Sequence, residues 1–241
     1  MGGRGSSSPT SRSVVGQIDD AEKQARIKAY RALKEAGFDA TDIRATMPAD
    51  QFAEIAERLV ELEGEYGITG KDGESKVSLA YEQLGEAAGA AAVHSPGLQP
   101  MNVQRMTFNS SYDTKTVDAE MAKAQESGRF MPFDSKTTTN WQYMATHEYG
   151  HAVQRHILHK LGGSWKSESE VDEMAQTHKD KILVKSLKYV KDSGSFISKY
   201  AASSPYEFFA EAFANAHGGS PNGVGLGMRD FLTDVKKQGL L

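Results

Sequence analysis

His147, Glu148 and His151 form a His-Glu-x-x-His segment, and these residue types at this spacing could bind a metal ion. On a helix, residues four apart project from one face, so both imidazoles can reach one ion at about 2.0–2.1 Å. Glu148 lies beside the first histidine, where it could accept a proton from a water that zinc acidifies to a pKa of about 7. The alternative is a chance match in an ordinary amphipathic helix. A catalytic zinc site also needs a third protein ligand and an open position.

The segment from 204 to 213 could supply that ligand. Ser204 and Pro205 suit the N-cap and first position of a helix, on which Glu207 and Glu211 share one face while most other positions are apolar. Carboxylates on a buried helix are costly unless something neutralises them, and a dication held by two imidazoles would do so. We therefore predict Glu207 as the third ligand and Glu211 as a hydrogen-bond partner of His147. The alternative is that both glutamates lie on a solvated edge of the helix.

Together these segments resemble the catalytic domain of anthrax toxin lethal factor and its relatives, a gluzincin type of zincin metallopeptidase. The resemblance rests on His-Glu-Tyr-Gly-His at 147–151 and on Tyr-Glu-Phe-Phe-Ala-Glu-Ala-Phe at 206–213. It also rests on Tyr200, because in that family a tyrosine seven residues before the ligand glutamate reaches the active site, and 207 − 200 = 7.

The resemblance implies one zinc ion bound by His147, His151 and Glu207, with Glu148 as general base. It implies that Tyr200 stabilises the oxyanion or assists the leaving amine and that Glu211 supports a ligand histidine, as a phenol and a carboxylate beside a metal can do. Tyr206 competes with Tyr200 for its role, and simple packing is the alternative for either tyrosine.

A weaker likeness covers a short stretch that is expected to be a strand. Met106, Thr107, Phe108 and Asn109 would form the edge strand that pairs with an extended substrate. The opening Gly-Gly-Arg-Gly also resembles phage-encoded proteins associated with head assembly, among which small zincins occur.

The other histidines are expected to stay outside the site. His94, His178 and His217 lie among polar or small residues and are predicted to be surface residues. His156 and His159 follow the motif at the wrong spacing to join it and are predicted to face solvent.

Three further residues flank or interrupt the motif. Gly150 lowers helix propensity by about 1 kcal/mol relative to alanine, which makes sense if another backbone packs closely there. Trp141 and Trp165 are interpreted as core residues rather than substrate subsites.

Hydrophobic periodicity predicts a helix-dominated α+β chain: a zincin-like catalytic domain with a small mixed sheet and the motif on its active-site helix. Helices are predicted at Val14–Ala36, Pro48–Leu62, Val77–Val93, Val117–Ser127, Thr138–Leu161, Glu168–Tyr189, Pro205–His217 and Met228–Lys237, and strands at Asn102–Tyr112 and near Phe130–Phe133. The expected organisation is a flexible tail (1–13), a helical hairpin module (14–66) and a zincin metallopeptidase domain (67–241).

Composition narrows the classes of partner. The 241 residues include 28 basic and 32 acidic side chains, so no basic surplus points to nucleic acid. The chain has no cysteine, and a transition-metal site must therefore use His, Asp or Glu. We expect no membrane partner, since neither a spanning segment nor a signal peptide is evident, and a cytoplasmic or virion-associated location.

The sequence thus predicts a zinc-dependent endopeptidase that acts on polypeptides. Two alternatives stay open. One is a virion or scaffold component that retains a zinc site without turnover. The other is a host-directed protease toxin or effector, in which residues 14–66 would bind a viral-particle or delivery partner.

Overall fold

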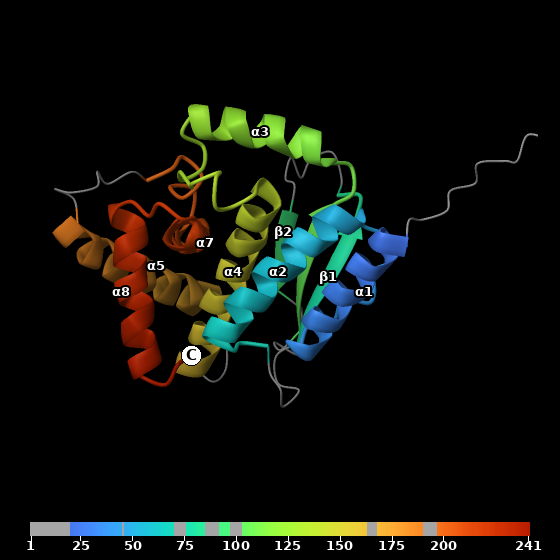
Figure 1. The fold of residues 1–241 in the computed structure, drawn as a ribbon. Coiled ribbons are helices and arrows are strands. Elements are labelled where there is room, and N and C mark those ends of the chain that lie inside the picture. The colour runs from blue at the N-terminus through green and yellow to red at the C-terminus, as the bar shows by residue number, and fades with distance from the viewer. Residues whose placement is uncertain are drawn as a thin grey trace, which may run out of the picture.

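A computed structural model describes residues 20–44, 46–69, 76–84, 92–96, 103–162, 168–189 and 197–241 (Figure 1). Its helices are α1 (Asp20–Glu35), α2 (Ala49–Tyr66), α3 (Thr114–Glu126), α4 (Asn140–Gly162), α5 (Glu168–Ser186), the 3-10 turn η2 (Leu187–Tyr189), α7 (Pro205–His217) and α8 (Gly223–Lys237). Its strands are β1 (Lys76–Glu82), β2 (Ala92–Pro96) and β3 (Val103–Asn109). The predicted helix-dominated α+β class is confirmed. The predicted tail at 1–13 and Trp165 lie outside the described residues.

The sheet is mixed, with the order β1-β3-β2: β1 runs parallel to β3, and β2 runs antiparallel to it. The strand predicted over Asn102–Tyr112 is confirmed as β3. The helix predicted over Val77–Val93 is wrong, because its two ends form β1 and β2. Val77 and Leu79 are buried on alternate positions of β1, a period of two that outweighs the helix propensity of the alanines further on.

The strand order also corrects the substrate-strand prediction. Met106, Thr107, Phe108 and Asn109 belong to β3, which has hydrogen-bonded neighbours on both sides and is therefore not an edge strand. Among the described strands, β1 and β2 form the two edges.

The strand expected near Phe130–Phe133 is also wrong. Met131 donates its backbone N–H to a carboxylate oxygen of Glu211, at 2.6 Å, rather than to a neighbouring strand. The first residue after this stretch, Asp134, donates its backbone N–H to the carbonyl of Gly218. The segment therefore lies alongside α7 and does not pair with a strand.

Several helix boundaries differ from the prediction: α2 ends four residues after Leu62, α3 begins three residues before Val117, and α5 and α8 differ as well. α8 begins five residues before Met228, because Asn222 caps it by accepting hydrogen bonds from the N–H groups of Val224 and Gly225. Gly227 lies within this helix and packs closely against α5. A Cβ added at this position would meet Ser186 Oγ at 2.2 Å. The regular α-helix of α5 ends at Ser186, and the 3-10 turn η2 continues it.

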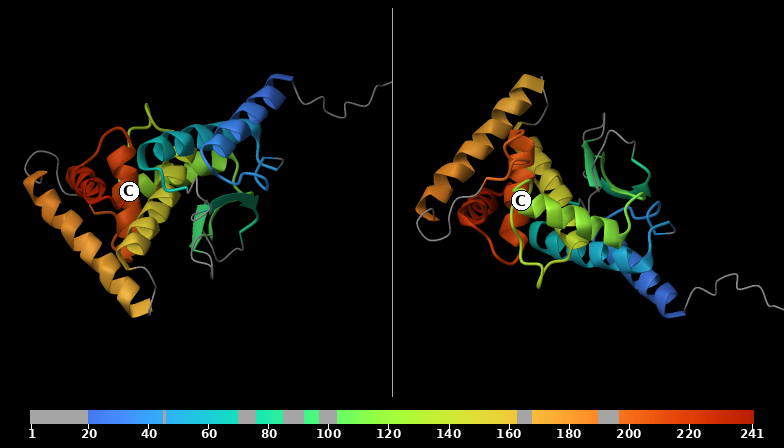
Figure 2. Two further views of the ribbon diagram at one scale, coloured as in Figure 1. Left: turned by 90° about the horizontal axis from the view of Figure 1, so that it is seen from below. Right: turned by 90° about the horizontal axis from the view of Figure 1, so that it is seen from above.

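Helix α4 lies in the middle of the molecule. The sheet, α1 and α2 lie to one side of it, and α5, α7 and α8 lie to the other, as the further views show (Figure 2). α3 lies across one end of this arrangement (Figure 1). Both flanking groups pack on α4, which therefore holds the motif at the centre of one continuous apolar core.

The helical hairpin predicted for residues 14–66 shares this core. Leu33 of α1 and Phe52 of α2 belong to the same buried cluster as the apolar residues of α4 and α7. Arg58 of α2 also donates from Nε to Thr146 Oγ1 of α4 at 2.8 Å. The guanidinium of Arg58 also donates a hydrogen bond to the carbonyl oxygen of His217, at 2.5 Å. Hydrogen bonds therefore connect α2 with both α4 and α7.

None of the helices in the described part of the chain combines the length and the apolar character that crossing a membrane requires.

Candidate metal centre

The motif helix α4 starts at a reciprocal cap. Thr139 Oγ1 accepts a hydrogen bond from the N–H of Gln142, whose side-chain oxygen accepts one from the N–H of Thr139. Two turns further on, His147 and Glu148 are 7% and 5% exposed, so the two reactive side chains are largely withdrawn from water.

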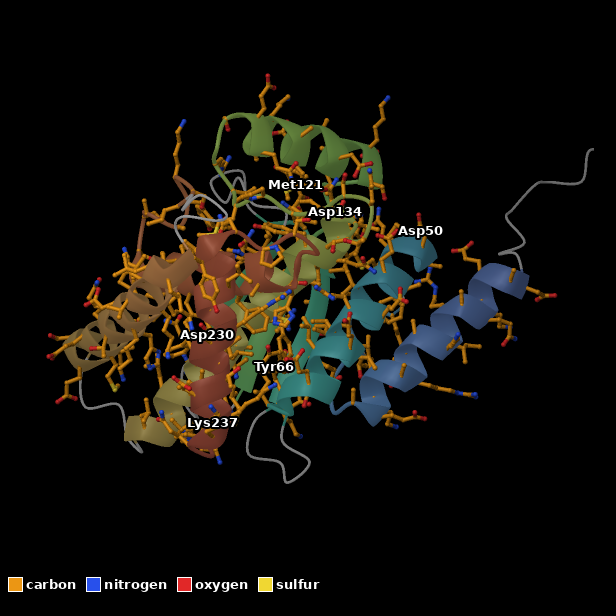
Figure 3. All side chains as sticks on the ribbon, turned by 60° about the vertical axis from the view of Figure 1, so that its left-hand side comes forward. Asp50, Tyr66, Met121, Asp134, Asp230 and Lys237 are labelled. Carbon is orange, nitrogen blue, oxygen red and sulfur yellow. The ribbon has the colours of Figure 1, made fainter. Side chains whose placement is uncertain are left out.

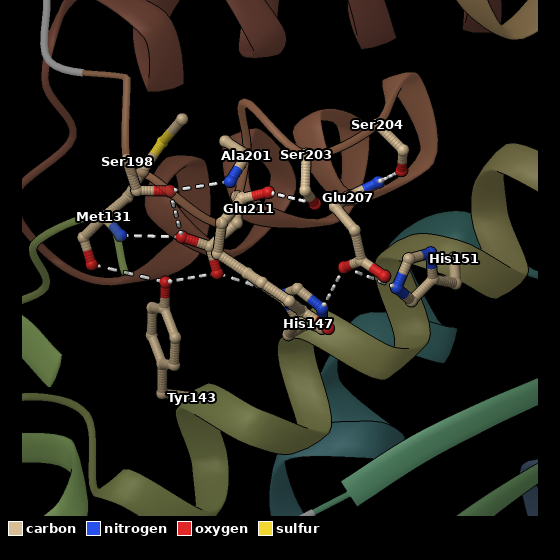
Figure 4. Close-up of polar contacts among 11 residues, drawn as sticks. Met131, Tyr143, His147, His151, Ser198, Ala201, Ser203, Ser204, Glu207 and Glu211 are labelled. Carbon is tan, nitrogen blue, oxygen red and sulfur yellow. Dashed lines mark hydrogen bonds and ion pairs between the residues drawn. The ribbon is translucent and has the colours of Figure 1, made fainter. Parts of the chain in front are cut away.

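Helix α7 brings the third side chain to the motif. Ser204 caps α7 by accepting from the N–H of Glu207 at 3.1 Å, and Pro205 occupies the first turn, as predicted. Glu207 Oε2 then lies 3.2 Å from His147 Nε2 and 3.4 Å from His151 Nε2 (Figure 4). Three predicted ligands from two helices thus meet at one point.

The arrangement of these atoms fits a shared ion. Ligand atoms of His147, His151 and Glu207 all lie within 4.8 Å of one another. Glu207 Oε2 is buried and, among the described residues, accepts no well-aligned hydrogen bond although it lies close to both imidazoles. A buried carboxylate oxygen of this kind needs a cation, so these residues could hold a metal ion.

Among Glu207, His147 and His151, each charged side chain favours the charged form of its neighbours. Burial opposes ionisation of Glu207, but its contacts with His147 and His151 outweigh burial and lower its pKa. Burial likewise opposes protonation of His147, whereas Glu207 and Glu211 raise its pKa to about 10. Positive charge is therefore favoured where the three side chains meet.

Glu211 is fully buried one turn beyond Glu207, and its contacts explain how a charge is tolerated there. Oε1 accepts from Tyr143 Oη at 3.2 Å and from His147 Nδ1 at 3.1 Å. Oε2 accepts from Met131 N at 2.6 Å and from Ser198 Oγ at 3.0 Å (Figure 4). The predicted contact with His147 is present. If a metal ion takes the place of the proton on Nε2, the contact with Glu211 keeps the other proton on Nδ1 and turns the Nε2 lone pair toward the shared position.

Glu148 follows His147 on α4 and does not belong to the group that could hold a metal ion. Burial raises the pKa of its carboxyl, which the charges of His147 and His151 oppose. The carboxylate of Glu148 also accepts a hydrogen bond from the backbone of His94, which lowers its pKa. A withdrawn carboxylate with a raised pKa next to a metal position is suited to accept a proton.

Tyr200 lies against the ligand set. Its ring stacks on His147 with 5.8 Å between centroids, and Phe130 meets it edge-on at 5.4 Å. Its backbone N–H donates to the carbonyl of Arg129 at 3.0 Å. Burial and then the charges of Glu207 and Glu148 raise the pKa of Tyr200, so the hydroxyl remains a hydrogen-bond donor.

The competing tyrosine lies elsewhere. The hydroxyl of Tyr206 donates to Asp172 of α5 at 3.0 Å, on an exposed part of the surface. Of the two candidates, only Tyr200 stacks on a ligand histidine.

His94 belongs to the surroundings of the site, and its predicted surface position is wrong. Its ring stacks on His151 with 5.7 Å between centroids and an angle of 19°, and its Nε2 lies 2.8 Å from Gln104 Oε1. Burial and the neighbouring His151 lower its pKa to about 3. The sequence could not indicate this position, because the segment before His94 was predicted to be a helix and His94 in fact lies in the strand β2.

Three other histidines also differ from the prediction. His178 is buried between Phe209 and Phe231 instead of lying at the surface. His156 is half-buried, and burial lowers its pKa to about 4. His217 is partly buried as well, with its ring 2.8 Å from the hydroxyl of Tyr66, whereas His159 is exposed as expected.

The close packing inferred at Gly150 is present. A Cβ on this residue would lie 3.1 Å from Ala210 Cα and 3.1 Å from Phe213 Cβ, both on α7. The absence of a side chain lets the ligand-bearing helices approach each other. Trp141 is a core residue, as predicted.

Compared with protein-family models, with curated proteins and with solved structures, the chain finds no match.

Proposed function

We propose that this protein is a zinc-dependent endopeptidase of the gluzincin type that the sequence resembles. The observation that carries the proposal is the convergence of His147, His151 and Glu207, with Glu148 beside them. Two imidazoles and one glutamate are a ligand set of catalytic zinc sites, which keep one further position open.

Two of the three spacings between the candidate ligand atoms are compatible with zinc, and all three lie within 4.8 Å. Atoms about 2.0–2.1 Å from one ion in tetrahedral geometry lie about 3.3–3.4 Å from each other. Glu207 Oε2 lies 3.2 and 3.4 Å from the two histidine nitrogens.

Each neighbouring side chain has a role in this chemistry. A zinc ion held by His147, His151 and Glu207 would polarise the scissile carbonyl and lower the pKa of a water. Glu148 accepts the proton of that water and passes it to the leaving amine. Tyr200 donates a hydrogen bond to the oxygen on which negative charge develops. Glu211 holds His147 in the tautomer that binds the ion.

The sheet suggests how a polypeptide would lie. β2 borders the site through His94 and is an edge among the described strands. An extended peptide could add to such an edge through main-chain hydrogen bonds. We propose that β2, and not residues 106–109, pairs with an extended substrate.

Metal analysis of the purified chain and unbiased cleavage profiling, with Glu148→Gln beside wild type, test the proposal. We expect about one zinc per chain in both proteins, and a loss of hydrolysis of about 10²–10⁴-fold in the variant. Glu126→Gln, a change of an exposed carboxylate on α3, is the matched control and should cleave like wild type.

The outcomes separate the alternatives. Undiminished cleavage by Glu148→Gln, or a chain that binds no zinc, contradicts the proposal. Stoichiometric zinc without cleavage of any peptide by wild type would favour the scaffold alternative.

A further inference from the structure

One face of β3 packs against the motif helix. Gln104, Met106 and Phe108 alternate along β3 and are all buried, and the ring of Phe108 meets that of Trp141 on α4, with 6.5 Å between centroids. β2 also contacts α4, and side chains fill the space between the sheet and this helix (Figure 3). His94 of β2 is opposite Met106 in the register of the sheet, so its side chain lies on the same face.

Gln104 fixes the ring of His94. It lies diagonally across from His94, two residues from Met106, where a side chain of this length can reach its neighbour. His94 Nε2 lies 2.8 Å from Gln104 Oε1. Gln104 is 2% exposed, and a buried amide is costly without a hydrogen-bond partner, so this contact is favoured. Because an amide oxygen only accepts, Nε2 of His94 donates the hydrogen bond.

His94 in turn lies against a predicted metal ligand. Its ring stacks on that of His151 with 5.7 Å between centroids and an angle of 19°. This distance and the near-parallel arrangement are typical of offset stacking. The ring of His147 meets that of His151 at 83°, with 5.0 Å between centroids. These two contacts restrict rotation of the His151 ring, whose Nε2 lies 3.4 Å from Glu207 Oε2.

The two histidines of the motif are thus oriented in different ways. His147 is held by the carboxylate of Glu211, through a hydrogen bond on Nδ1. His151 is held by the face of a neighbouring ring that comes from the sheet. Neighbours that touch a ligand and not the ion set the direction of the ligand lone pair, and their loss commonly lowers metal affinity about 10- to 100-fold. The ring of His94 occupies such a position.

Resting on the zinc centre proposed above, we infer that His94 is a positioning residue for His151. The stacked ring of His94, itself held by Gln104, keeps Nε2 of His151 directed at the shared metal position. This role depends on the flat face of the ring and on the packing of β2 against α4. It does not require a ring nitrogen directed at the ion, so another aromatic side chain can take the place of the imidazole.

Zinc affinity of the full chain, measured by chelator competition at fixed pH, tests the inference. His94→Ala removes the stacked ring and should weaken zinc binding about tenfold. His94→Phe made together with Gln104→Leu keeps a ring against His151 and leaves no buried amide without a partner, so this combined variant should bind zinc like wild type. Val93→Ala is the matched control, because this neighbour of His94 points to the other face of β2. It should not change the affinity.

The visible absorption of the cobalt-substituted protein gives a second readout, since its bands report the geometry of the ligands around the ion. We expect His94→Ala to shift these bands, and the combined variant and Val93→Ala to leave them in place. A loss of packing without a change at the ion would lower the urea midpoint of His94→Ala and would not move the bands. Urea denaturation of the same samples therefore separates positioning from packing.

The two proposals fail in different ways. An equal loss of zinc affinity in His94→Ala and in the combined variant means that a nitrogen of His94 acts on the ion directly, which overturns the inference. Unchanged zinc affinity and cobalt bands in His94→Ala also overturn it; a raised KM for peptides would then assign His94 to the substrate, and the peptidase proposal would stand. If wild type binds zinc but cleaves nothing, the peptidase proposal fails, while the affinities still decide the role of His94. A wild type that binds no zinc contradicts both.

Discussion

His147 Nδ1 lies 3.1 Å from Glu211 Oε1, and three further donors meet the same buried carboxylate. The histidine on α4 is therefore oriented by a residue of α7 that is 64 positions later in the chain. Because one carboxylate joins Met131, Tyr143, His147 and Ser198, it couples the candidate metal centre to the packing of its surroundings.

Replacement of Glu211 tests this coupling. In Glu211→Gln an amide NH₂ takes the place of one oxygen and faces donors, so we expect zinc affinity to fall about 10- to 100-fold. Chelator competition at fixed pH measures the affinity, and circular dichroism on heating measures the accompanying loss of stability. Ser198→Ala removes one hydrogen bond to the same carboxylate and should have the smaller effect. Equal zinc affinity in wild type and Glu211→Gln would contradict the positioning role.

Tyr200→Phe separates the hydroxyl from the ring. The phenylalanine can still stack on His147 and Phe130, so zinc binding should not change. Loss of the hydrogen bond to the developing charge should lower kcat about 10²–10³-fold. Tyr206→Phe is the matched control, because the hydroxyl of Tyr206 contacts Asp172. This substitution should leave kcat unaltered. A similar kcat for wild type and Tyr200→Phe would assign Tyr200 a packing role instead.

Local sequence patterns were sufficient to predict the two helices that carry the site. The positions of Ser204, Pro205, Glu207 and Glu211 define the start and one face of α7, and the four-residue step of the motif defines a face of α4. Both patterns depend on residues within two helical turns, where spacing alone determines which side chains lie together.

The sheet and its neighbours could not be predicted in the same way. The order β1-β3-β2 depends on pairing between distant segments, and the alanines before β2 suggested a helix instead. His94 reaches His151 only through that pairing, so its role beside the site was invisible in the sequence.

The close approach of α4 and α7 predicts opposite effects for two glycine substitutions. Gly150→Ala would place a Cβ 3.1 Å from atoms of Ala210 and Phe213 and should lower the free energy of unfolding by about 1–3 kcal/mol, despite better helix propensity. Gly64→Ala lies in α2 with nothing within 4 Å of the added atom and should raise it by about 0.5–1 kcal/mol. Urea denaturation of both variants measures the difference. A Gly150→Ala protein as stable as Gly64→Ala would mean that α4 and α7 lie further apart.

The buried His178 predicts a dependence of stability on pH. Burial and then the charge of Lys181 lower its pKa to about 4, whereas an unfolded histidine titrates near 6.5. The unfolded chain therefore binds this proton more readily, and the stability present above pH 6.5 is lost as the pH falls toward 4. Between pH 7 and pH 5 this one residue should account for about 1–2 kcal/mol of lost stability.

Urea midpoints of wild type and His178→Leu at both pH values measure that contribution. Leucine keeps an apolar contact with Phe209 and Phe231 but carries no titrating group, so the variant should lose less stability on acidification. His159→Leu changes an exposed histidine and should retain the pH dependence of wild type. Two partly buried histidines, His94 and His217, also have lowered pKa values, so His178→Leu should reduce the dependence without abolishing it. If His178→Leu and His159→Leu lose the same stability between pH 7 and pH 5, His178 is accessible to protons in the folded protein and does not carry this effect.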